Sequence, residues 1–97
     1  MKEVAVNAVP EGAQLVDVRE DFEYAEDHAA GTVHIPMQEI PARADELDGT
    51  KEIYVICKGG GRSAQVCQYL EQSRGWDVIN VEGGTDAWRA AGLPMER

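Results

Sequence analysis

The sequence has few basic residues, few aromatic residues and no long apolar run. Lysine and arginine number 9 against 18 acidic residues, so the formal net charge at pH 7 is −9. Sequence-independent binding to nucleic acid or anionic lipid needs a basic surface, and the charge argues against both partners. The longest apolar run, Ile53–Cys57, is far too short to span a bilayer, and the N-terminus has no apolar segment of signal-peptide length. We therefore expect a cytoplasmic protein with no nucleic-acid or membrane partner.

Cysteine is equally scarce. The only two cysteines, Cys57 and Cys67, stand ten residues apart, and one of them lies beside a run of glycines. This arrangement does not resemble a disulfide framework, and no residues have the paired spacing of metal ligands. The sequence predicts no metal site and no cofactor, and it favours a reactive thiol.

The length and composition fit one soluble domain covering residues 1–97. Hydrophobic residues make up 43% of the chain and charged residues 28%, and there is no repeat, low-complexity tract or linker. Short β-branched runs bounded by turn residues predict strands at Gln14–Arg19, Thr32–Pro36, Glu52–Cys57 and Asp77–Glu82, with a weaker fifth candidate at Glu3–Val6.

The segments between these strands have helical character. They are Glu20–Ala30, Met37–Leu47, Arg62–Gly75 and Gly84–Gly92. Alternating strands and helices imply crossover connections. We therefore predict an α/β fold with a mainly parallel sheet of four to five strands and helices on both faces. Ligands in such folds bind beyond the carboxyl ends of the strands, which is where Cys57 ends its strand.

The residues after Cys57 favour an anion site. Lys58, Gly59, Gly60 and Gly61 separate the cysteine from Arg62 and Ser63, where a helix is expected to begin. Such a loop directs backbone N–H groups toward one point, and the helix dipole adds positive potential there. We expect Cys57 in a solvent-facing loop, with the N–H groups and the cations of Arg62 and Lys58 lowering the pKa of its thiol.

Four fragments, in their order and spacing, resemble a single-domain rhodanese. They are "LVDVRE", "FEYAEDHAAGTVHIP", "CKGGGRS" and "VINVEGGTDAWRAAGLP", and the resemblance covers the chain from about Leu15 to Pro94. The resemblance implies a sulfurtransferase in which Cys57 takes a sulfane sulfur as a persulfide. The sulfur then passes to a thiophilic acceptor such as cyanide or a thiol. By the same resemblance, Lys58 to Ser63 hold the persulfide and a small anionic donor, thiosulfate or a persulfide.

The length of the loop distinguishes sulfur transfer from phosphatase or arsenate-reductase chemistry. Four residues lie between Cys57 and Arg62, whereas the related phosphatases and arsenate reductases with a cysteine-arginine loop place five there. A phosphoryl group needs donors around three oxygens, and a single added sulfur atom needs less room. The short loop therefore favours sulfur transfer. The family often has arginine at the position of Lys58, so bidentate recognition of the donor is not expected from that residue.

Alternatives to a turnover enzyme stay open at this point. The chain could be a carrier that relays persulfide sulfur between protein partners or, with less support, a phosphatase-like or arsenate-reducing enzyme. Cys67 fits a small core hydrophobe on the apolar stripe of its helix, or a resolving thiol. His28, His34, Asp17 and Arg19 are expected to serve the fold. Neither the donor, the acceptor nor the oligomeric state follows from the sequence.

Overall fold

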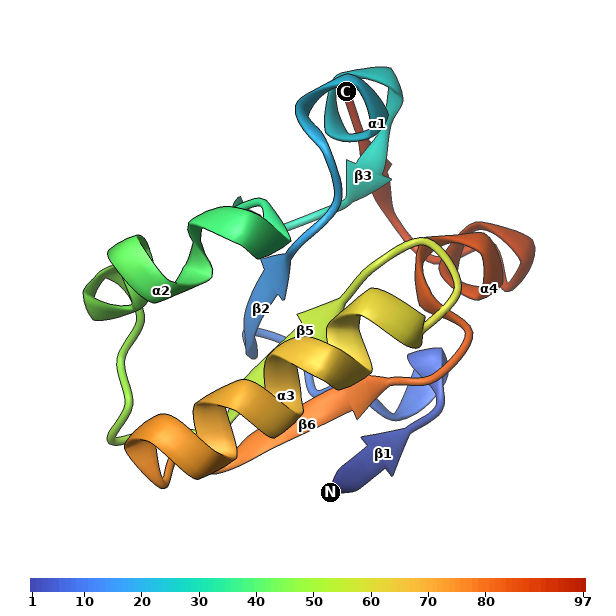
Figure 1. The fold of residues 1–97 in the computed structure, drawn as a ribbon. Coiled ribbons are helices and arrows are strands. Elements are labelled where there is room, and N and C mark those ends of the chain that lie inside the picture. The colour runs from blue at the N-terminus through green and yellow to red at the C-terminus, as the bar shows by residue number, and fades with distance from the viewer.

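The β-branched runs form a five-stranded parallel sheet. The computed structural model describes residues 1–97, and its main sheet has the strand order β1-β6-β5-β2-β4 (Figure 1). The strands are β1 (Lys2–Val4), β2 (Gln14–Asp17), β4 (Thr32–His34), β5 (Ile53–Ile56) and β6 (Val78–Val81). All four pairings are parallel. The predicted sheet is confirmed, and its weaker fifth strand is β1.

Helices cover both faces of this sheet, as predicted. The helical segments are η1 (Val6–Ala8), α1 (Asp21–Glu26), η2 (Met37–Glu39), α2 (Ile40–Arg43), η3 (Ala44–Glu46), α3 (Gly61–Arg74) and α4 (Gly84–Ala90). Successive residues of β5 point to opposite faces. Val55 and Cys57 join a core cluster with Val66 and Leu70 of α3. Ile56 joins a second cluster with Trp88 of α4.

The central strands are buried along their whole length. Every residue of β5 and of β6 is buried, which explains their near-continuous apolar sequences. Helix α3 begins after Gly60 and ends at Gly75, and both of these glycines are left-handed. The predicted end of this helix at Gly75 is confirmed. No helix in the structure is both long and apolar enough to cross a membrane.

The helix predicted over Glu20–Ala30 is wrong in its second half. Helix α1 ends at Glu26, and Asp27 is fully extended. The Arg19 guanidinium donates a 2.8 Å hydrogen bond to the Asp27 carbonyl, which helps to hold the backbone in that conformation. The next residues form β3 (His28–Ala29), which pairs antiparallel with β7 (Met95–Glu96) in a small second sheet.

The helix predicted over Met37–Leu47 is also shorter than expected. Only Ile40–Arg43 is α-helical, and single 3-10 turns stand on either side of it. Pro41 has no backbone N–H and is tolerated only in the first turn of a helix, which explains why α2 begins at Ile40 and not at Met37.

The residues expected to serve the fold do so. Asp17 and Arg19 form a buried ion pair of 2.9 Å at the end of β2. The rings of His28 and His34 both stack on the ring of Tyr24, at centroid distances of 3.7 and 4.2 Å. His34 also hydrogen-bonds the Arg19 carbonyl at 2.8 Å. Both histidines are thus engaged in local structure.

Candidate functional site

Cys57 lies at the carboxyl end of the central strand of the sheet. It directly follows β5, and α3 begins at Gly61, four residues further on. The segment from Cys57 to Ser63, which we name the Cys57 loop, turns from the sheet into this helix (Figure 1). Gly60 caps the helix with φ at +110°, a conformation that residues with a Cβ rarely adopt. The expected position of Cys57 at the carboxyl end of a central strand is confirmed.

The sulfur of Cys57 is held by two neighbours from its own loop. The Gly60 N–H donates to Sγ at 3.1 Å, and the Ser63 hydroxyl lies 3.2 Å from Sγ. Both Cys57 and Ser63 are almost completely buried, with exposed fractions of 1% and 0%. The expectation that Cys57 faces solvent is therefore wrong. The sulfur lies at the bottom of the loop, because its side chain points to the α3 face of the sheet.

Burial and hydrogen bonding act in opposite directions on the pKa of the Cys57 thiol. Burial is the largest single effect and raises the pKa of the Cys57 thiol. Hydrogen bonds from the Ser63 hydroxyl, and from the backbone N–H groups of Ser63, Gly60 and Gly59, act in the opposite direction and together outweigh burial. The net result is a pKa of Cys57 below its ordinary value. The thiolate is the nucleophilic form of cysteine, so the loop activates it.

Ser63 is oriented by a residue from the neighbouring strand. Its hydroxyl lies within reach of the Gly60 carbonyl, at 3.1 Å, and of the Asn80 Oδ1. The Asn80 amide donates to Glu3 Oε2 at 3.0 Å and to the Gly60 carbonyl at 3.2 Å. These donations fix the amide so that its oxygen faces Ser63. Because a hydroxyl carries one proton, Asn80, Gly60 and the Cys57 thiolate compete for it.

Comparison with known proteins identifies the family of this chain. The family described as the rhodanese-like domain matches residues 2–91. The chain belongs to this family of sulfurtransferases. It is 41% identical to YtwF of Bacillus subtilis, over 97% of this chain and 96% of that protein. It is 37% identical to the thiosulfate sulfurtransferase GlpE of Actinobacillus pleuropneumoniae serotype 3, over 89% of this chain and 80% of that protein.

A solved structure agrees with the sequence comparison. The crystal structure of SSP1007 from Staphylococcus saprophyticus superimposes with a TM-score of 0.87 at 40% identity, and the match covers 97% of this chain and 99% of that one. The rhodanese-like fold predicted from the sequence is therefore confirmed over nearly the whole chain.

The start of α4 in this rhodanese-like domain holds the backbone of the Cys57 loop by hydrogen bonds. The backbone N–H and the hydroxyl of Thr85 both donate to the Cys57 carbonyl, at 2.8 and 3.1 Å. The Asp86 N–H donates to the Lys58 carbonyl at 3.1 Å. Gly84 makes this approach possible, because a Cβ there would lie 2.3 Å from the Cys57 carbonyl oxygen. The start of α4 thus fixes the backbone of Cys57.

Arg62 and Lys58, which were expected to stabilise the Cys57 thiolate together with the N–H groups, are each paired with a carboxylate. Arg62 makes a forked ion pair with Glu23 at 2.7 and 3.0 Å. Lys58 pairs with Asp86 at 3.0 Å. The Glu23 hydrogen bond is the main reason that the pKa of Arg62 is raised, and the charge of Cys57 contributes less. Hydrogen bonds, rather than these side chains, make the direct contacts with the sulfur.

Cys67 lies in the core of the domain, away from this chemistry. It is completely buried in the cluster beneath α3. Burial raises the pKa of its thiol to about 12, so it stays protonated at neutral pH. A protonated, enclosed thiol is a poor attacking group. The structure thus supports the core role over the resolving thiol.

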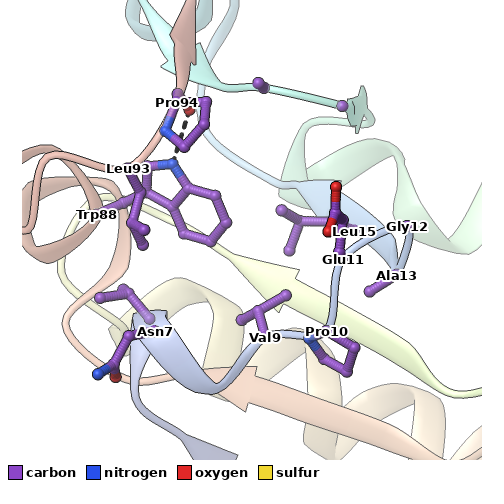
Figure 2. Close-up of a pocket in the computed structure, with 13 residues that line it drawn as sticks. Asn7, Val9, Pro10, Glu11, Gly12, Ala13, Leu15, Trp88, Leu93 and Pro94 are labelled. Carbon is purple, nitrogen blue, oxygen red and sulfur yellow. Dashed lines mark hydrogen bonds between the residues drawn. The ribbon is translucent and has the colours of Figure 1, made fainter.

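One cavity of the domain lies away from the Cys57 loop. A cavity of about 560 Å³ lies between η1, the start of β2 and Trp88 of α4 (Figure 2). Its apolar lining includes Val9, Leu15 and Leu93, and the Trp88 indole N–H is already bonded to the Pro94 carbonyl at 2.8 Å. No residue of the Cys57 loop lines this cavity. No group of three or more His, Cys, Asp or Glu side chains is arranged to hold a metal ion.

The predicted site residues therefore fall into two groups. Around the sulfur the structure gathers Cys57, Gly59, Gly60 and Ser63, whereas Lys58 and Gly61 are exposed and Arg62 turns toward Glu23. The sequence reading missed four supporting residues, which are Glu23, Asn80, Gly84 and Thr85. A usable signal existed only for Gly84, in the paired glycines of "VEGGTDAW".

Replacing Ser63 tests the hydrogen-bond account. We expect Ser63→Ala to raise the pKa of Cys57, because it removes the hydroxyl that favours the thiolate. Sulfur transfer should fall on the order of tenfold at pH values between the wild-type and variant pKa, where only the wild type is ionised. The deficit should vanish above both values. Ultraviolet titration of the thiolate measures the shift.

The matched control is Ser63→Thr, which keeps the hydroxyl. It should restore the pKa of Cys57 if the added methyl group fits. An unchanged titration curve in Ser63→Ala would show that the backbone N–H groups suffice by themselves.

Proposed function

We propose that this chain transfers sulfane sulfur through a persulfide on Cys57. The observation that supports the proposal is the Cys57 sulfur, which accepts hydrogen bonds from the loop at the N-terminus of α3 and has a lowered pKa. A thiolate in that position is a nucleophile that needs no separate general base. The proposed substrate-binding residues are Lys58, Gly59, Gly60, Gly61, Arg62 and Ser63.

The reaction has two displacement steps. The Cys57 thiolate attacks the sulfane sulfur of thiosulfate or of a persulfide, and the donor's sulfur–sulfur bond breaks. The leaving sulfite or thiolate takes the bonding electron pair, and Cys57 becomes Cys–S–S⁻. Cyanide or an acceptor thiolate then attacks the outer sulfur and releases the Cys57 thiolate. No net oxidation occurs, so the protein needs no redox cofactor for this cycle.

The loop supports sulfur over phosphorus as the transferred element. Between Cys57 and Arg62 stand only four residues, and one of them, Gly60, already donates its N–H to Sγ. A phosphoryl group needs several donors around its oxygens. A single added sulfur atom needs fewer donors, and we expect it to use the same N–H groups.

Intact-protein mass spectrometry tests the proposal. After incubation with thiosulfate or with an alkyl persulfide, we expect the protein to gain the mass of one sulfur atom and to lose it on addition of cyanide. A protein that gains no sulfur from either donor would contradict the proposal.

The same samples separate an enzyme from a relay. Repeated thiocyanate formation from small donors indicates an enzyme. A persulfide that forms and then passes only to another protein indicates a carrier.

A further inference from the structure

The two cations beside the nucleophile are each matched by a carboxylate. Arg62 gives both of its terminal nitrogens to Glu23, and the two side chains are only 31% and 15% exposed. Lys58 pairs with Asp86 at 3.0 Å. Glu23 is itself fixed, because its carboxylate also accepts the Glu20 N–H at 2.9 Å and completes the cap of α1. An incoming anion therefore meets ion pairs rather than free cations.

The charged cavity next to the loop is balanced in the same way. It has a volume of about 380 Å³ and no hydrophobic lining residue. Its lining contains equal numbers of basic and acidic side chains, namely Arg19, Lys58, Arg89, Arg97, Glu23, Glu26, Asp27 and Asp86. Arg89 is held by Asp27 at 2.7 Å and by Asp86 at 3.3 Å. The cavity offers charge in both signs and no net positive field.

We propose that Glu23 and Asp86 select against doubly charged donors, so that the site favours a sulfur donor with one negative charge, such as an alkyl persulfide or a thiosulfonate, over dianionic thiosulfate. This inference rests on the proposed function. The loop N–H groups can donate hydrogen bonds to the sulfane sulfur of either substrate. Both cations of the loop are already paired, so the second charge of thiosulfate would meet no free cation, and the carboxylates of Glu23 and Asp86 would repel it.

The Lys58–Asp86 and Arg62–Glu23 ion pairs differ in strength. The side chains of Lys58 and Asp86 are 62% and 50% exposed. Ion pairs that are this exposed separate easily. The forked and half-buried Arg62–Glu23 pair is harder to open. Its strength is visible in Glu23, whose pKa is lowered to about 2, chiefly by the Arg62 hydrogen bonds. Glu23 should therefore have the larger effect on donor choice.

Two donors isolate the effect of charge. Thiosulfate and methanethiosulfonate both give one sulfur to the Cys57 thiolate, and they release sulfite and methanesulfinate with the bonding electron pair. They differ by one negative charge. The measured quantity is the ratio of kcat/KM for methanethiosulfonate to kcat/KM for thiosulfate, with cyanide as acceptor. Changes in the reactivity of Cys57 affect both donors and largely cancel in this ratio.

Glu23→Gln keeps an oxygen that can accept the Glu20 N–H but removes the charge beside Arg62. We expect it to lower the ratio about fivefold, because thiosulfate gains more than methanethiosulfonate, as fits the loss of one nearby charge interaction. Asp86→Asn should lower the ratio by a smaller factor. The matched control is Glu46→Gln, which removes a carboxylate paired with Arg43 at 2.8 Å, outside the Cys57 loop.

The outcomes are distinct. A lowered ratio in Glu23→Gln with an unchanged ratio in Glu46→Gln supports the inference. An unchanged ratio in both Glu23→Gln and Asp86→Asn overturns it, as does an equal change in Glu46→Gln. If neither donor adds sulfur to wild-type Cys57, the proposed function fails, and this inference fails with it.

Discussion

Cys57→Ser is expected to abolish sulfur transfer while the protein remains folded. A serine hydroxyl is not ionised at neutral pH and has no neighbouring base here, so the rate should fall by a factor on the order of 10³ or more. The hydroxyl can use the same hydrogen-bonding neighbours, Gly60 N–H and Ser63 Oγ. The free energy of unfolding should therefore change by only about 1 kcal/mol. Thiocyanate formation and denaturant unfolding measure the two effects.

Cys67→Ala is the control for this prediction. Its side chain packs in the core and its pKa is raised by burial, so the variant should lose stability, by about 1 kcal/mol, and keep its transfer activity. Substantial thiocyanate formation by Cys57→Ser, or its loss in a folded Cys67→Ala, would place the persulfide elsewhere.

Local sequence was enough to predict the sheet and the Cys57 loop. Strands β5 and β6 are buried on both faces, so their apolar, β-branched composition is itself the signal. Helix α3 has a left-handed glycine at each end, and Gly75 marks its end in the sequence. The Cys57 loop was also recognisable from local sequence, because its cysteine, its glycines and Ser63 are consecutive or nearly so.

The features that were missed depend on contacts between distant parts of the chain. Strand β3 exists because His28 and Ala29 meet Glu96 and Met95, and nothing near residue 28 encodes that pairing. The same holds for the charges of the site. Glu23 and Arg62 stand 39 residues apart, and Lys58 and Asp86 stand 28 apart. The sequence showed the charges on the loop, but their pairing with distant carboxylates could be seen only in the folded structure.

The contact between the start of α4 and the backbone of Cys57 gives the second large prediction. We expect Gly84→Ala to reduce both stability and sulfur transfer. Gly84 has φ at +58°, and a Cβ there would lie 2.3 Å from the Cys57 carbonyl oxygen and 2.5 Å from that of Lys58. The backbone would have to move apart, which would break the Thr85 hydrogen bonds to Cys57. The free energy of unfolding should fall by about 2–4 kcal/mol, and transfer by about tenfold or more.

Gly92→Ala separates the two causes of that loss. Gly92 has a similar φ of +73°, but a Cβ there would meet nothing within 4 Å. It should therefore show only the cost of the left-handed conformation, about 1–2 kcal/mol, with transfer unchanged in the folded protein. Thermal unfolding and kcat/KM, both measured where each variant is folded, give the comparison. If Gly84→Ala transfers sulfur as fast as Gly92→Ala, the contact between the start of α4 and the Cys57 carbonyl does not position the nucleophile, and the hydrogen bonds within the Cys57 loop must do so without it.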